Sequence, residues 1–210
     1  MKSELLKNMQ YSEKFVQPSR HFSIPDMLLR FLKRIKISDV LDFGCGYGNL
    51  LRSLILFNSK LKITGVDISF KRINFLKKEL PYQNFYVGDV LNFKSKEKFD
   101  LVVSTQVIEH VKNPKKFIDN FSVLLRNEGY AYINSVVKKP WAVYKYRNEG
   151  NFVLDPTHYY EFKSLNHFVS FFEKDFQVLE KSIFPVKRRL FGFEVRIPGF
   201  YIVEVLLKKK

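Results

Sequence analysis

A glycine-rich segment between an apolar strand and an amphipathic stretch constrains the fold of this chain most. Residues 39–43 (DVLDF) are typical of a short buried strand, residues 44–48 (GCGYG) supply three glycines, and residues 49–57 (NLLRSLILF) are apolar at helical spacing. Glycines allow a tight turn after a strand and let a ligand approach the backbone closely. A strand, a glycine loop and a helix in this order predict an α/β fold with a ligand at the end of the strand.

Strands and helices alternate through the first 136 residues. A first helix should follow Ser23, with the hydroxyl as its cap and Pro25 and Asp26 near its start. Further strands are expected at 61–66, 84–87, 99–104 and 130–136, and helices at about 69–80 and 114–126. This alternation implies parallel strands joined by right-handed crossovers, with the helices covering the sheet.

The pattern changes after residue 137. Residues 138–160 are aromatic and basic without a clear period, and they indicate an inserted loop or lid. A helix is expected at 164–172, followed by strands at 176–183 and 200–207. Because the basic segment 184–199 contains glycine and proline rather than a helical pattern, the last two strands are expected to form an antiparallel hairpin.

Composition limits the class of protein. Hydrophobic residues make up 46% of the 210 residues, which is enough for one domain with a buried core. The single cysteine, Cys45, excludes an internal disulfide and fits a reducing compartment. Since the N-terminus lacks a signal peptide and no apolar run approaches the ~18 residues of a membrane span, we expect a cytoplasmic protein.

The formal net charge of +15 favours an anionic partner, although scattered lysines could equally serve to solvate the surface. The basic, aromatic segment 184–210 suggests contact with an anionic membrane surface. The segment 138–147 interleaves rings with positive charge, which suits base stacking and phosphate contact in RNA. Its rings and cations are Trp141, Tyr144, Tyr146, Lys138, Lys139, Lys145 and Arg147.

Two acids follow the next two predicted strands. Asp67 lies about twenty residues beyond the glycine loop, where a carboxylate can accept both hydroxyls of an adenosine ribose. A helix cap is the other explanation of Asp67. Asp89 follows the third strand, where it can accept from the adenine amino group; the alternative is a turn residue after Gly88.

Five segments together resemble a known family. VLDFGCGYGNL, ITGVDIS, FYVGDV, FDLVVSTQVIEHV and LLRNEGYAYINSV are similar, in order, to the successive motifs of class I S-adenosylmethionine (SAM)-dependent methyltransferases, over about residues 38–137. VIEHV followed by proline resembles the type 11 and type 23 group that contains ubiquinone-pathway O-methyltransferases. A glycine loop is also found in NAD and FAD enzymes. NAD is disfavoured here by the Glu-His pair after the fourth strand and by the terminal hairpin.

The resemblance implies a Rossmann-like α/β fold. Its sheet would have seven mostly parallel strands, a terminal antiparallel hairpin and helices on both faces. A single methyltransferase domain would contain an N-terminal helical segment (1–37), a SAM-binding core (38–137), an inserted substrate-side loop (138–163), and a C-terminal helix and hairpin (164–210).

The resemblance also implies which residues bind SAM. The glycine loop would wrap the methionyl part, the second strand's end would hold the ribose and one face of the adenine, the third strand's end would contact the base, and the fourth strand's end would lie near the methionine. These residues are, in that order, Asp42, Gly44, Cys45, Gly46 and Gly48; Asp67 and Ile68; Asp89 and Val90; Thr105 and Gln106.

Methyl transfer to a hydroxyl or a protonated amine needs a group that removes a proton. The candidate catalytic residues are Glu109 and His110 in the VIEHV motif and His158 in the polar, aromatic stretch 155–162. The titration range of His110 suits a general base. In many enzymes of this group the Glu-His pair orients the loop instead, and His158 could belong to a structured turn.

The same three residues could offer a metal one carboxylate and two imidazoles. This arrangement resembles small-RNA 3′-end 2′-O-methyltransferases, which use Glu-x-x-Glu-His with a later His. Here Gln106 stands in place of the first Glu and removes a charged ligand, so no metal is expected. Upstream, Tyr11, Arg20 and His21 are candidates to meet the SAM carboxylate or the substrate, with ordinary packing as the favoured explanation.

The sequence therefore predicts a SAM-dependent methyltransferase that acts on a small molecule. The expected acceptor is a hydroxyl oxygen of a sugar, a lipid-linked intermediate or a quinone-type compound. The alternatives are an RNA methyltransferase that uses the segment 138–147, and a SAM-binding protein without catalysis.

Overall fold

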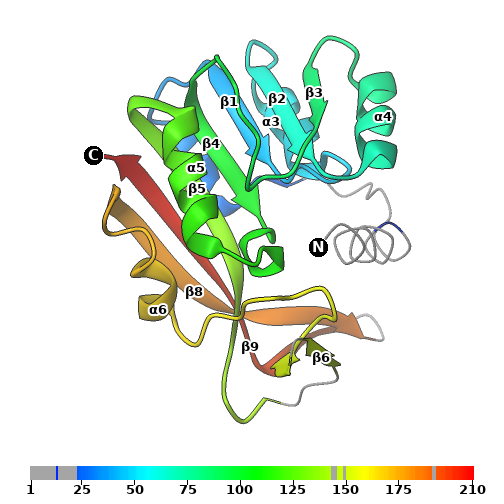
Figure 1. Cartoon of the computed structure of the whole chain (residues 1–210), viewed down its shortest axis with the longest axis vertical. Coiled ribbons are helices and arrows are strands. Elements are labelled where there is room, and N and C mark those ends of the chain that lie inside the picture. The colour runs from blue at the N-terminus through cyan, green and yellow to red at the C-terminus, as the bar shows by residue number, and fades with distance from the viewer. Residues whose placement is uncertain (1–12, 14–22, 143–145, 149, 191–192) are drawn as a thin grey trace.

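The computed structural model describes residues 13, 23–142, 146–148, 150–190 and 193–210. Seven strands form one sheet in the order β3-β2-β1-β4-β5-β9-β8 (Figure 1). The strands are β1 (Asp39–Phe43), β2 (Lys62–Asp67), β3 (Asn84–Val87), β4 (Phe99–Thr105), β5 (Leu125–Lys138), β8 (Phe176–Leu190) and β9 (Phe193–Lys209). β1 to β5 pair in parallel, whereas β9 is antiparallel to both β5 and β8. The predicted fold class is confirmed.

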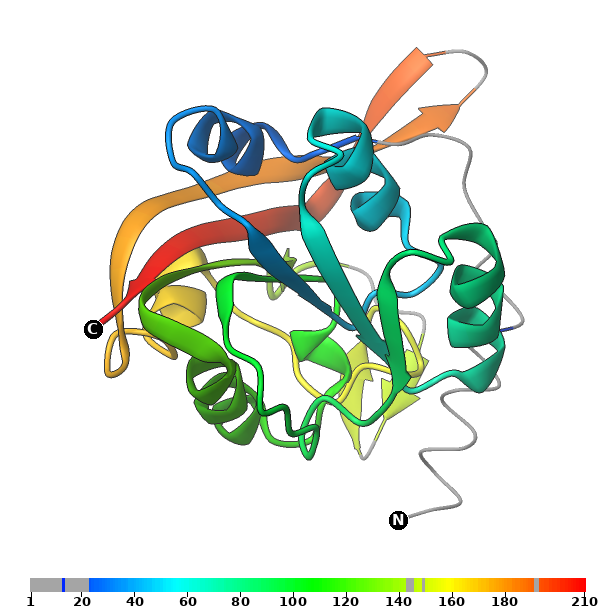
Figure 2. The same ribbon diagram turned by 90° about the horizontal axis from the view of Figure 1, so that it is seen from above.

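Helices cover both faces of the sheet (Figures 1 and 2). On one face, α2 (Asp26–Leu32), α3 (Asn49–Phe57) and α4 (Phe70–Glu79) contribute buried apolar residues to one core. On the other face, α5 (Pro114–Leu124) and α6 (Leu165–Val169) contribute to a second core rich in phenylalanine. A short 3-10 helix, η1 (Ile108–His110), follows β4. No helix in the described ranges combines the length and apolarity needed to cross a membrane.

The starts of α4 and α5 follow local sequence, whereas that of α2 differs from the prediction. The Ser69 side chain caps α4 by accepting from the Arg72 amide, and Asn113 caps α5 before Pro114. The expectation that Ser23 caps the first helix is wrong. Pro25 occupies that cap position and has no hydroxyl, and α2 begins at Asp26.

The C-terminal hairpin is longer than predicted. The segment 184–199, expected to be an irregular connection, continues β8 and β9 as a paired ladder that reaches Leu190↔Phe193. Backbone pairing therefore continues through a segment whose proline, glycine and cations indicated a loop. The expected loop 138–160 also contains a small antiparallel hairpin of β6 (Tyr146–Asn148) and β7 (Asn151–Val153).

Candidate functional site

The glycine loop joins the carboxyl ends of the central strands. The amides of Gly44 and Cys45 donate to the Val66 carbonyl at the end of β2, at 2.8 and 2.9 Å. Gly44 has φ 94°, and a Cβ there would lie 2.4 Å from Val107 Cγ2, in the segment after β4. Only glycine combines this backbone conformation with so close an approach, so the loop fixes the relation between β1, β2 and the end of β4.

The other two loop glycines differ in their surroundings. Gly48 has φ 74°, and a Cβ there would lie 2.5 Å from Leu76 Cδ2 of α4. Gly46 has φ 55°, and no described atom lies within 4 Å of where its Cβ would be. Gly48 therefore serves packing, while the Gly46 backbone borders open space in the described structure, where a ligand can approach.

Asp67 connects the loop to β2 and α4. Its carboxylate accepts from the Gly46 amide and from the Ser69 amide, each at 2.9 Å, and the Arg72 guanidinium lies 3.7 Å away. The cap of α4 is Ser69, so capping does not account for Asp67. The Ser69 hydroxyl also donates to Glu13, the described residue of the N-terminal segment. A carboxylate beside the loop backbone suits a ribose diol.

Asp42 is a buried acid under the loop. Its side chain is among the buried polar groups, and its Oδ1 has no hydrogen-bond partner among the described residues. Burial, with the nearby charge of Asp67, raises the pKa of Asp42 to about 8. Burial also raises the pKa of the neighbouring Cys45 thiol, which argues against a reactive thiolate.

The ends of β2 and β3 present the remaining adenosine candidates. Ile68 is half-buried next to Asp67. Asp89 accepts from the Leu91 amide at 2.9 Å and from the Asn92 side-chain amide at 2.8 Å. Val90 is buried in the apolar core. Asp89 thus forms a turn, as the alternative explanation predicted, and each of its bonded oxygens retains a second lone pair that could accept from an adenine amino group.

The end of β4 carries backbone strain. Gln106 has φ 56°, a conformation that non-glycine residues rarely adopt and that clusters at functional sites. Its amide donates to the Asn134 side chain of β5 at 3.1 Å, and its side-chain amide approaches the same oxygen at 3.3 Å. Thr105 immediately precedes it and is half-buried. Asn134 therefore holds the chain at the predicted methionine end of the site.

The structure brings the three predicted catalytic residues together from distant segments. Glu109 and His110 lie on η1, and His158 comes from the insertion after β5. The ligand atoms of the three side chains lie within 4.8 Å of one another. The His110 and His158 rings are 4.7 Å apart, edge to face. The Tyr159 and Tyr160 amides donate to the Glu109 carbonyl, which ties the insertion to η1.

Each member of this cluster has a supporting partner. One Glu109 carboxylate oxygen accepts from the Ser135 hydroxyl at 3.0 Å, and the other has no hydrogen-bond partner among the described residues. His110 Nδ1 lies 2.9 Å from the Thr157 hydroxyl. His158 Nδ1 lies 3.1 Å from the Glu161 carboxylate. In both rings Nδ1 faces a protein partner, which fixes the orientation of the imidazole.

Burial separates the proton affinities of the cluster. Burial, together with the charge of His158, lowers the pKa of His110 to about 4, so this ring is neutral at physiological pH. Burial opposes protonation of His158 too, but its hydrogen bond to Glu161 and the charge of Glu109 prevail and raise its pKa. Burial raises the pKa of Glu109, although His158 and Ser135 oppose the shift. His158 is therefore the more basic ring.

One carboxylate and two imidazoles can in principle hold a divalent cation. The fourth candidate from the sequence pattern, Gln106, directs its side-chain amide to Asn134. A metal-free site stays a prediction.

Several predicted residues lie outside the described part of the chain. These are Tyr11, Arg20 and His21 upstream of α2, and Tyr144 and Lys145 in the insertion. Within the described part, the Trp141 side chain is 65% exposed and Arg147 is exposed.

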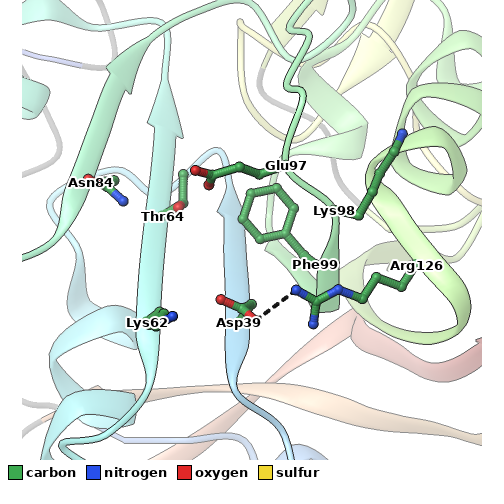
Figure 3. A pocket seen from close by; sticks show the side chains of 8 residues that line it. All are labelled: Asp39, Lys62, Thr64, Asn84, Glu97, Lys98, Phe99 and Arg126. Atoms are coloured by element: carbon green, nitrogen blue, oxygen red, sulfur yellow. Dashed lines mark hydrogen bonds and ion pairs between the residues drawn. The ribbon is translucent and has the colours of Figure 1, made fainter.

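A separate cavity of about 270 Å³ opens at the opposite edge of the sheet (Figure 3). It lies at the amino ends of the strands, where Asp39, Lys62 and Phe99 begin β1, β2 and β4. Arg126 lines it and donates to Asp39 at 2.9 Å. Because this cavity is at the far edge from the glycine loop, the candidate site does not include it.

Sequence reasoning missed four supporting residues. Arg72, Ser135, Asn134 and Glu161 contact Asp67, Glu109, Gln106 and His158 respectively. Arg72 carried a usable signal, because it is a charged residue on the face of α4 that also buries Ile73 and Leu76. The Ser135 and Asn134 contacts depend on tertiary structure, whereas Glu161 lies only three residues after His158.

Comparison with known proteins agrees with this geometry. A family model described as "Methyltransferase domain" matches residues 36–175. The mitochondrial ubiquinone biosynthesis O-methyltransferase of Dictyostelium discoideum is 32% identical over 115 residues, covering 48% of this chain and 36% of that protein. The (S)-coclaurine N-methyltransferase of Papaver somniferum is 30% identical over 128 residues, covering 55% and 35%. The matches thus span little more than a third of these relatives.

A solved structure shows the same fold across nearly the whole chain. The N-methyltransferase NodS from Bradyrhizobium japonicum WM9, in complex with S-adenosyl-L-homocysteine, superposes with a TM-score of 0.66 at 14% identity, covering 96% of this chain and 98% of that one. The family match extends from the strand before the glycine loop to the helix after the insertion. The chain therefore belongs to the methyltransferase-domain family, the class I enzymes that use SAM as their cofactor.

Proposed function

We propose that the protein transfers the methyl group of SAM to a hydroxyl oxygen of a small molecule, such as a sugar, a lipid-linked intermediate or a quinone-type compound. The acceptor oxygen attacks the methyl carbon, the carbon–sulfur bond breaks, and S-adenosyl-L-homocysteine leaves. The hydroxyl proton must pass to a base. The protein's part is to align the acceptor, exclude water and take this proton.

The observation that supports this proposal is the His158–Glu161 pair beside Glu109. A carboxylate on Nδ1 orients the ring and stabilises its protonated form, as in hydrolase triads. The Glu161 hydrogen bond raises the pKa of His158, whereas burial lowers the pKa of His110 to about 4, so His158 is the stronger base of the two. We therefore assign proton removal to His158 and alignment of the acceptor to His110 and Glu109.

Cofactor binding is tested first by calorimetric titration with SAM and, separately, NAD. SAM should bind and NAD should not. Asp67→Ala should weaken SAM binding about tenfold to a hundredfold, because it removes charged hydrogen bonds to the ribose. The matched control is Asp119→Ala, an exposed acid on α5. Tight NAD binding, or equal SAM affinity in both variants, would refute the assigned site.

Acceptor chemistry is tested with labelled SAM against hydroxylated compounds, amines and a single-stranded RNA. Methylated hydroxyl products would support the proposal, and an N-methyl product would replace it with amine methylation. Methylated RNA would favour the alternative that uses Trp141 and the segment around it. SAM binding without turnover of any acceptor class would favour a binding protein.

The role of His158 is tested with His158→Gln, once an acceptor is found. Loss of general base catalysis should lower kcat about 10²- to 10⁴-fold, while the dissociation constant of SAM stays unchanged. His167→Gln, on α6 outside the cluster, is the control. Unchanged kcat in His158→Gln would remove His158 from proton transfer.

A further inference from the structure

The β8–β9 hairpin extends beyond the sheet as a separate two-stranded ribbon. The pairing of β9 with β5 ends at Lys138↔Phe200, whereas its pairing with β8 continues to Leu190↔Phe193. We define the arm as residues 186–190 and 193–198. Figure 2 shows these two strand segments projecting past the helices. Within the part of the chain that the structure describes, no third strand therefore pairs with the arm.

A bend separates the arm from the sheet. The register shifts between Pro185 and Lys187 of β8, opposite a stretch of β9 that contains Gly199 at φ 81°. Irregularities of this kind bend a strand and increase its twist. The exposed ring of Trp141 lies at this bend, since a Cβ at Gly199 would be 3.1 Å from Trp141 Cζ3.

The two faces of the arm differ in chemistry. Phe193 and Val195 alternate with Glu194 and Arg196, and successive residues of a strand point to opposite faces. The Phe193 side chain is 75% exposed and Val195 is 43% exposed. On the other face Lys187 Nζ lies 2.9 Å from a Glu194 carboxylate oxygen. The arm thus exposes an apolar face backed by a charged one.

Further exposed side chains lie on β8 before the bend and on the charged face of the arm. Ile183 and Phe184, on β8 before the bend, are 40% and 43% exposed. Lys181 and Arg196 are also exposed. Exposed rings and aliphatic groups beside cations are typical of segments that lie in the headgroup region of a membrane, where apolar groups enter the acyl boundary and cations meet anionic lipids.

We propose that the β8–β9 arm docks on an anionic lipid surface. Charge complementarity favours lipid over a second copy of the chain, because a copy would bring the same net charge of +15 and a like-charged arm. Val195 is aliphatic and provides no stacking surface for a base, which favours lipid over RNA. Docking would hold whether or not the methyl acceptor is itself a lipid.

The test is co-sedimentation of the full chain with two kinds of vesicle. One is phosphatidylcholine alone and the other contains one part phosphatidylglycerol to two of phosphatidylcholine. Wild type should bind the anionic vesicles and not the neutral ones. Phe193→Ser with Val195→Ser should reduce the binding constant by about tenfold or more, since it removes apolar area that enters the interface.

Lys187→Gln with Arg196→Gln should reduce the binding constant for the anionic vesicles by about tenfold, since each cation near an anionic membrane contributes to the free energy of binding. Leu56→Ser, an exposed apolar residue of α3, and Lys77→Gln with Lys78→Gln on α4 are the matched controls. All substituted side chains are exposed, so melting temperatures should match wild type.

Three outcomes would overturn the proposal. They are no binding to anionic vesicles, equal binding to both kinds, and arm variants that bind as well as the α3 and α4 controls. Sedimentation velocity at several concentrations identifies a dimer that the arm variants dissociate, which would assign the arm to a second copy. RNA affinity that falls in Phe193→Ser with Val195→Ser would assign it to nucleic acid.

Discussion

Asp42 shows how one buried carboxyl group couples folding to pH. The folded-state pKa is about 8, whereas an unfolded aspartate has a pKa of about 3.9. Between these values the folded state binds more protons than the unfolded chain, so this residue makes stability fall as pH rises. We expect Asp42→Asn to gain stability over wild type progressively from about pH 4 to about pH 8. A melting-temperature difference that is constant with pH would contradict this.

The melting temperatures should be measured on ligand-free protein, because the positive charge of bound SAM would favour the ionised form of Asp42. His110 supplies the control, since its lowered pKa gives the opposite slope. Between about pH 4 and about pH 6.5 the His110 ring binds fewer protons in the folded state than in the unfolded chain. Its contribution to the free energy of unfolding is therefore lost as pH falls from about 6.5 towards about 4. The difference in melting temperature between His110→Gln and wild type should therefore grow as pH falls, whereas the difference for Asp42→Asn grows as pH rises.

At the residue scale, local sequence predicted what local geometry requires. Gly44 and Gly48 could be recognised because a turn after a strand needs positive φ, and Asp67 because it ends the next strand. The strained conformation of Gln106 could not be recognised, since it depends on Asn134, which lies 28 positions away in sequence. A helix-capping role was the alternative for Asp67, and Ser69 fills that role in the structure.

At the scale of elements, a buried polar bridge joins the three C-terminal strands. Tyr132 of β5 donates to Glu204 of β9 at 2.5 Å, and Ser182 of β8 donates to the other carboxylate oxygen at 2.8 Å. Tyr132→Phe should destabilise the protein by about 1–3 kcal/mol, because it leaves a buried carboxylate oxygen without its donor. Urea unfolding measures this, and Tyr86→Phe, a half-exposed ring on β3, is the control.

Replacing Glu204 as well should recover part of that loss. A double variant, Tyr132→Phe with Glu204→Gln, no longer buries a charge without its donor. Equal losses in Tyr132→Phe and Tyr86→Phe would show that the bridge contributes no stability.

The elements predicted with most success are those whose hydrophobic period is strong, such as α4, α5 and β4. The arm was missed because 184–199 contains proline, glycine and a cluster of cations, which usually indicate a loop. In the structure Pro198 and Gly199 lie near a bend within a continuous strand. Turn residues thus did mark a real change of direction, but they could not show that pairing continues on both sides.

At the scale of the whole molecule, the alternation of elements and the resemblance together predicted a mostly parallel sheet with a terminal antiparallel hairpin, and the structure confirms it. Sequence could place SAM at the carboxyl edge of a parallel sheet, because every open α/β sheet binds there. It could not show that His158, from the insertion, would meet Glu109 and His110, which lie 49 and 48 positions earlier in the sequence. The three side chains lie close together because the Tyr159 and Tyr160 amides donate to the Glu109 carbonyl of η1.

The place of β9 in the sheet has a consequence for how the chain is made. β9 lies between β5 and β8, although it is the last of the seven strands to be synthesised. Until it emerges from the ribosome, β5 and β8 each present an unsatisfied edge to the cell. Interrupted synthesis shortly before residue 200 would therefore yield the complete glycine loop and cluster, with β5 exposed at the edge of the sheet and β8 without its partner strand. Such fragments should aggregate rather than persist as soluble partial enzymes.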